Sequence, residues 1–83
     1  MFVILKPSSG TPKDNLERAR LEIERTFGFR GSVTGVKAKR SRIIVEFEPN
    51  PKWDMPQAEK ESYLMEWIPA KVRQTFKVIS VSA

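Results

Sequence analysis

The chain has 83 residues, a length that favours one small domain, which we assign to residues 1–83. It contains no cysteine and no histidine, which excludes a disulfide scaffold, a thiolate metal site, and the commonest general base and metal ligand of enzymes. Fifteen basic and ten acidic residues give a formal net charge of +5, which favours an acidic partner.

The N-terminal third predicts a strand and then a helix. Residues 2–5 form an apolar run, and the turn-forming residues 7–10 close it, as is typical of a short buried strand. A helix is expected over residues 12–27, with Gly28 as a left-handed C-terminal cap. Its apolar face follows from residues three or four positions apart: Leu16, Ala19, Ile23 and Phe27.

The middle of the chain predicts a β-hairpin. Strands are expected over residues 32–39 and 42–48, and Arg40 and Ser41 would form the tip between them. Gly35 indicates a bulge in the first of these strands, where the alternation of apolar residues slips. The second strand alternates cleanly, so one of its faces is expected to be apolar.

The C-terminal third predicts a second helix and a last strand. The helix is expected over residues 56–68, because Pro69 disfavours helical geometry in the residue before it. Residues 70–75 are compatible either with another helical turn or with a connecting loop. The last strand is expected over residues 76–81, where apolar and β-branched residues return.

This order of elements, β-α-β-β-α-β, favours an α+β fold of the ferredoxin-like split βαβ type. Its sheet would have four antiparallel strands, with both helices on one face. Right-handed crossovers would place the first and third strands at the centre of the sheet.

The predicted sheet has one face directed at the helices and one open face. Alternation assigns Val3, Leu5, Ile43, Val45 and Phe47 to the helix side. This leaves several apolar side chains for the open face, more than a solvated face normally carries. Either a second copy or another partner covers this face, or the exposure is ordinary, or the register is off by one residue. The residues in question are Phe2, Ile4, Ile44 and Val78.

The positive charge is concentrated in one stretch. Residues 25–45 hold six basic residues and no acidic one, whereas residues 46–66 hold six acidic and two basic residues. Four cations in the predicted hairpin suit a phosphate backbone, although lysines on a hairpin also hinder edge-to-edge aggregation. The candidate phosphate contacts are Lys37, Lys39, Arg40 and Arg42, extended by Arg30, Lys71, Arg73 and Lys77.

The loop over residues 49–56 contains three prolines, which restrict its conformations, together with Trp53 and Met55. A rigid loop that presents a tryptophan is a reasonable anchor for a protein partner. The alternative is that Trp53 covers the end of a small core.

We therefore expect a non-enzymatic binding module whose hairpin contacts RNA or DNA, with no catalytic residue, metal or cofactor. The alternative is a protein–protein module that meets an acidic or self-complementary surface: a small inhibitor, adaptor or subunit of the kind that phages and mobile elements encode. Its interface would consist of Phe2, Ile4, Ile44 and the loop with Trp53 and Met55. The partner in this alternative can also be a second copy of the chain, which gives a homodimer. No apolar run approaches the length of a membrane span, and no leader pattern is seen, so we expect a cytoplasmic protein.

Overall fold

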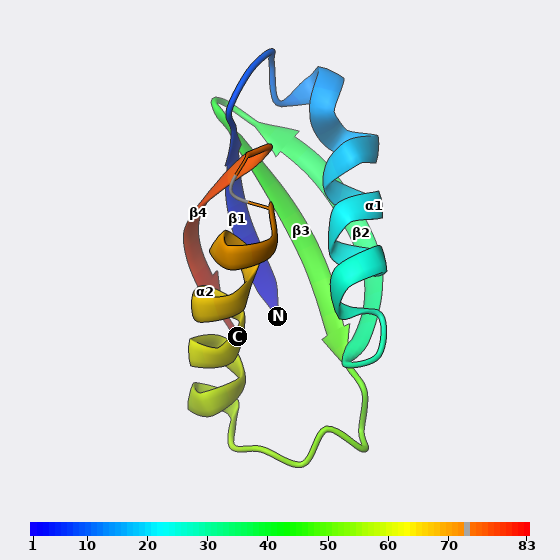
Figure 1. The fold of residues 1–83 in the computed structure, drawn as a ribbon. Coiled ribbons are helices and arrows are strands. Elements are labelled where there is room, and N and C mark those ends of the chain that lie inside the picture. The colour runs from blue at the N-terminus through cyan, green and yellow to red at the C-terminus, as the bar shows by residue number, and fades with distance from the viewer. Residues whose placement is uncertain (73) are drawn as a thin grey trace.

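The computed structural model of the chain describes residues 1–72 and 74–83. Four strands form one antiparallel sheet in the order β2-β3-β1-β4, and two helices complete an α+β fold (Figure 1). The predicted class and the central place of the first and third strands are confirmed. The elements are β1 (Phe2–Pro7), a 3-10 turn (Lys13–Asn15), α1 (Leu16–Phe27), β2 (Gly31–Lys39), β3 (Arg42–Pro49), α2 (Gln57–Val72) and β4 (Phe76–Ser82).

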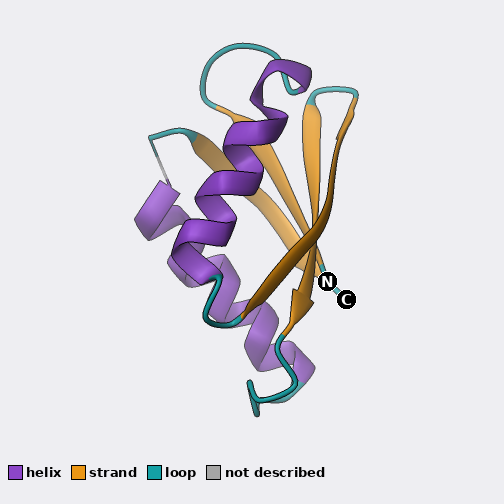
Figure 2. Cartoon of the chain, turned by 90° about the vertical axis from the view of Figure 1, so that its right-hand side faces the viewer, coloured by secondary structure: helices purple, strands orange, loops and turns teal. Residues whose placement is uncertain are grey.

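Both helices lie on the same side of the sheet, as Figure 2 shows, and the core fills the space between the two layers. The predicted inward set of β1 and β3 is confirmed, because alternate residues of these strands are completely or almost completely buried. The main core residues from the sheet are Val3, Leu5, Ile43, Val45 and Phe47, and those from the helices are Ala19, Ile23, Phe27, Leu64, Ile68 and Val72.

The second helix is longer than predicted, because α2 continues through Pro69 to Val72. Proline removes one backbone donor and strains the helix, but the extra turn keeps Val72 in line with Leu64 and Ile68 on the buried face. Burial of these side chains outweighs the local penalty. The carbonyl of Val72 then accepts hydrogen bonds from the backbone N–H and the hydroxyl of Thr75.

Each outer strand of the sheet contains an irregularity in its register. In β2, Val33 pairs with Phe47 and Gly35 with Glu46, so Thr34 is the extra residue of the predicted bulge. The second irregularity lies in β4 and was not expected from the sequence. It is an extra residue opposite β1, and its position alters which side chains of β4 face the helices.

The expectation that Val78 lies on the open face is therefore wrong. Ile4 pairs with Ser80 and Leu5 with Val78, which leaves Ile79 as the extra residue. Val78 shares the side of Leu5 and packs against the core, whereas Ile79 is 37% exposed. A shift of one residue moves a side chain to the other face of the sheet.

The end of α1 also differs from the prediction. Gly28 has a φ of −61°, in the right-handed region, so it is not a left-handed cap. The backbone N–H of Arg30 donates to the carbonyl of Phe27 at 2.9 Å instead. This tight turn satisfies a terminal carbonyl without a left-handed residue.

Candidate functional site

Four cationic side chains lie in a line across the open face of the sheet. Lys39 of β2 pairs with Arg42 of β3, and Lys6 of β1 pairs with Lys77 of β4. The register between β1 and β3, continued by one residue, places Lys6 opposite Arg42. Neighbouring strands are about 4.8 Å apart, so the line crosses the whole sheet within roughly 15 Å. We call Lys39, Arg42, Lys6 and Lys77 the basic row.

The next line of side chains on the open face is apolar at its centre. Ile44 pairs with Ile4 on β1, and Lys37 and Ser80 flank the two isoleucines on the outer strands. Phe2, which is 39% exposed, lies one line further from the basic row. The predicted open-face positions of Phe2, Ile4 and Ile44 are therefore confirmed.

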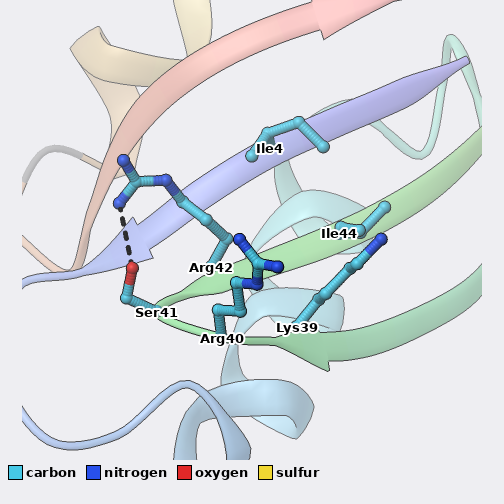
Figure 3. A pocket seen from close by; sticks show the side chains of 6 residues that line it. All are labelled: Ile4, Lys39, Arg40, Ser41, Arg42 and Ile44. Carbon is cyan, nitrogen blue, oxygen red and sulfur yellow. Dashed lines mark hydrogen bonds between the residues drawn. The ribbon is translucent and has the colours of Figure 1, made fainter.

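A hollow of about 500 Å³ lies where the basic row meets the isoleucines. Figure 3 shows Lys39 extending from the hairpin alongside Ile44, with Arg40 beside it and Ile4 on the neighbouring strand. Arg42 makes a long hydrogen bond of 3.5 Å to the hydroxyl of Ser41. The hollow thus combines an apolar floor with a cationic rim, and it is lined by Ile4, Lys39, Arg40, Ser41, Arg42 and Ile44.

Within residues 1–72 and 74–83, no cation of the basic row or the hairpin forms a salt bridge. The arginines of α1 behave differently, since Arg20 pairs with Glu17 and Glu24, and hydrogen bonds to these two carboxylates raise the pKa of Arg20. Like charges directly opposite in a sheet destabilise it. A bound anion would remove this repulsion on the open face.

The tip of the hairpin holds Arg40 in the left-handed region, with a φ of 58°. For a residue with a side chain this conformation costs about 1–2 kcal/mol, and glycine adopts it freely. We expect Arg40→Gly to raise the free energy of unfolding by roughly 0.5–1 kcal/mol, which corresponds to a few °C in thermal midpoint for a domain of this size. Thermal unfolding followed by circular dichroism measures this. A lower midpoint for the glycine variant would show that the backbone of Arg40 is unstrained.

Arg30 does not join the basic row, although the sequence grouped it with the hairpin cations. It precedes the start of β2, at the end of the strand away from the hairpin tip. Its guanidinium carbon lies 4.8 Å from the ring centroid of Phe29, 5.2 Å from that of Tyr63 and 5.5 Å from that of Trp53. Such contacts with ring faces stabilise the fold and leave Arg30 turned toward the aromatic cluster.

Trp53 is 5% exposed and belongs to the core, so the alternative in which it covers the core is the one observed. Its ring meets that of Tyr63 edge to face, with centroids 5.3 Å apart. Met55 is half-buried and packs against the same core. Neither side chain projects as an anchor, and the predicted partner-binding role of this loop is not supported by the structure.

The two remaining candidate cations have different outcomes. Lys71 lies on α2, on the helix side of the sheet, where it lines a hollow together with Glu22 and Ala70. It is therefore separated from the basic row by the sheet itself. Arg73 lies outside the described residues.

Lys6 is the functional candidate that sequence reasoning missed. It occurs in none of the dense basic stretches, because it follows an apolar run near the start of the chain. The signal was nevertheless present, since the alternation that places Phe2 and Ile4 on the open face also places Lys6 there. Only the pairing of β1 with both β3 and β4 brings it between Arg42 and Lys77.

In the part of the chain that the structure describes, neither helix is long and apolar enough to cross a membrane, and no three acidic side chains gather as a metal site would require. The chain matches no family model, no curated protein and no solved structure.

Proposed function

We propose that this protein is a non-enzymatic binding module that holds nucleic acid by its phosphates, acting in the cytoplasm. The observation that carries the proposal is the basic row, four cations in a line across all four strands that form no salt bridge within the described part of the chain. Lys37 and Arg40 extend this surface at the hairpin. The phosphates of a nucleic-acid strand form a regular line of negative charges, and a regular line of cations complements it.

The same proposal assigns the fold to the ferredoxin-like split βαβ arrangement. The order β2-β3-β1-β4 supports it, because the first and third strands are central and each helix connects two strands of one sheet. In this arrangement the helices occupy one face, and the other face is free for a ligand.

The number of phosphate contacts predicts how steeply affinity falls with salt concentration. Each neutralised phosphate contributes about 0.7 to the slope of log affinity against log salt for a single strand, and about 0.9 for a duplex. Four contacts give a slope of about −2.8 for a single strand and about −3.6 for a duplex. Affinity is then expected to fall about 50- to 150-fold between about 50 and 200 mM salt.

The most direct test distinguishes the contribution of the basic row to affinity from that of the net charge of the protein. The variant Lys6→Gln/Lys77→Gln removes two cations that only the fold brings together. Affinity for a labelled oligonucleotide is expected to fall about 60-fold at about 50 mM salt and about tenfold at about 200 mM. Fluorescence anisotropy titrations measure both values.

The matched control is Lys52→Gln/Lys71→Gln, which lowers the net charge by the same amount at exposed positions in the 50–56 loop and on α2. Its affinity is expected to stay within about twofold of that of the unmodified protein, since salt screens exposed charges that lie far from the bound phosphates. Equal losses in the two variants would show that only net charge matters and would rule out the basic row as the interface.

A second candidate function is a homodimer that covers the open face, and the apolar side chains there favour it: exposed Phe2 and half-buried Ile4 and Ile44. Glu46 lies two lines from the basic row on the same face. In a dimer packed face to face with antiparallel strand directions, the basic row of one copy would lie opposite Glu46 of the other. Light scattering over a range of protein concentrations measures the mass, and a monomer at all concentrations would contradict this candidate.

A further inference from the structure

Resting on the proposed function, we infer that the bound nucleic acid is single-stranded, with phosphates along the basic row and an unpaired base over Ile4 and Ile44. The observation behind this inference is the hollow, whose rim is cationic and whose floor is aliphatic. A surface that contacts phosphates alone has no use for the apolar floor beside the cations.

The spacing of the open face fits one nucleotide. Successive residues on one face of a strand are about 6.8 Å apart, because each residue advances the strand by about 3.4 Å. The isoleucine pair is therefore one such step from the basic row, comparable to the distance from a phosphate to the base of the same nucleotide. A duplex keeps its bases paired and stacked, whereas a single strand can turn a base onto a protein surface.

Phe2 is too distant to stack on the same base, since it lies two steps, or about 14 Å, from the basic row. The hollow itself contains no aromatic ring and no carboxylate or amide side chain that reads a base edge. The contact with the apolar floor is therefore hydrophobic and tolerant of base identity. With the cations of the rim engaged by phosphates, we expect affinity to vary little among sequences.

Phosphate contacts alone predict that a duplex binds more tightly than a single strand, which is the opposite of this inference. The two can therefore be distinguished by experiment. A duplex has the higher charge density, so four phosphate contacts favour a duplex over a single strand by about tenfold at about 50 mM salt. A preference for single strands must therefore come from contacts with the bases. We expect the single strand to bind at least as tightly as the duplex at this salt concentration, a reversal of about tenfold or more.

The test compares three labelled probes of about 12 nucleotides by fluorescence anisotropy: a single strand, the matching duplex, and a single strand in which every base is removed. The abasic strand is expected to bind about tenfold more weakly than the intact strand. That loss corresponds to about 1.4 kcal/mol, which is the burial of roughly 55 Å² of apolar surface at about 25 cal/mol per Å².

Protein variants locate the contact. Ile4→Thr/Ile44→Thr keeps two β-branched residues in the strands and is expected to lose about tenfold in affinity for the single strand and little for the duplex. Ile79→Thr is the matched control, because Ile79 is exposed on β4 but does not line the hollow. The ratio of the two affinities, measured on one protein sample, is independent of any loss of folded protein.

The outcomes separate this inference from the function on which it rests. A duplex bound about tenfold more tightly than the single strand, with no effect of base removal, would overturn the inference and leave the phosphate-binding function in place. Full single-strand affinity in Ile4→Thr/Ile44→Thr would overturn the placement of the base. If neither probe binds at low salt, the proposed function itself is wrong.

Discussion

Neutralising the entire basic row is expected to abolish the binding of nucleic acid. The variant carries Gln at Lys6, Lys39, Arg42 and Lys77. Each lost phosphate contact lowers affinity about eightfold at about 50 mM salt, so four losses amount to about 4,000-fold. Thermal stability should stay the same or rise, because the four like charges repel one another across the sheet. Anisotropy titration and a circular-dichroism melt measure the two quantities on one preparation.

The control for this variant removes four exposed cations away from the open face: Lys13, Arg18, Lys52 and Lys71. It has the same net charge and is expected to retain most of the affinity. If it loses as much affinity as the basic-row variant, attraction to nucleic acid is diffuse and no defined interface exists. If the basic-row variant keeps its affinity, the interface lies elsewhere on the molecule.

Truncation of Phe47 is expected to have the largest effect on stability. The side chain is 1% exposed and belongs to the core, on the face of β3 toward the helices. Phe→Ala changes in such positions cost about 3–5 kcal/mol, a large part of the roughly 5–15 kcal/mol that stabilises a typical domain. We expect a fall in the thermal midpoint of at least about 12 °C.

The matched control is Phe2→Ala on the opposite face of the sheet. Phe2 is 39% exposed, so its truncation is expected to cost less than about 1 kcal/mol. The pair of variants tests the register directly, because a slip of one residue would exchange the two faces of the sheet. Equal destabilisation by Phe47→Ala and Phe2→Ala would contradict the register on which the basic row depends.

The faces of the central strands are predictable from the sequence, because they follow from local alternation. Ile43, Val45 and Phe47 all point to the helices, and a clean alternation in β3 leaves no other choice for a half-buried strand. The hairpin tip and the bulge near Gly35 are likewise local, since turn and bulge residues act over only a few positions.

The basic row could be predicted only in part, because it depends on which strands are neighbours. Lys39 and Arg42 are close in the sequence and flank one turn, so their proximity is a local property. Lys6 and Lys77 belong to opposite ends of the chain, and only the sheet order places them beside Arg42. Arg30 was grouped with the hairpin cations because it is near them in the sequence. In the structure it precedes β2, at the end of that strand away from the hairpin tip.

Two of the incorrect predictions, those for Pro69 and Val78, share a physical cause, the priority of core burial over local preference. Pro69 breaks the rule for helix interiors because the turn that follows it buries Val72. Val78 faces the helices because the extra residue Ile79 shifts the alternation of β4. Neither outcome follows from the preferences of the residues concerned, since both depend on what the rest of the chain packs against them.

The irregular residues Thr34 and Ile79 have a further consequence, because β2 and β4 are the two borders of the sheet. A straight edge strand can form hydrogen bonds with a strand of another chain through its free N–H and C=O groups. A bulge disrupts the regular spacing of these groups and hinders such pairing. Copies crowded side by side on one long polymer would therefore resist merging into a continuous sheet. On the proposed function, copies bound close together along one nucleic-acid strand are expected to remain separate molecules and to dissociate individually.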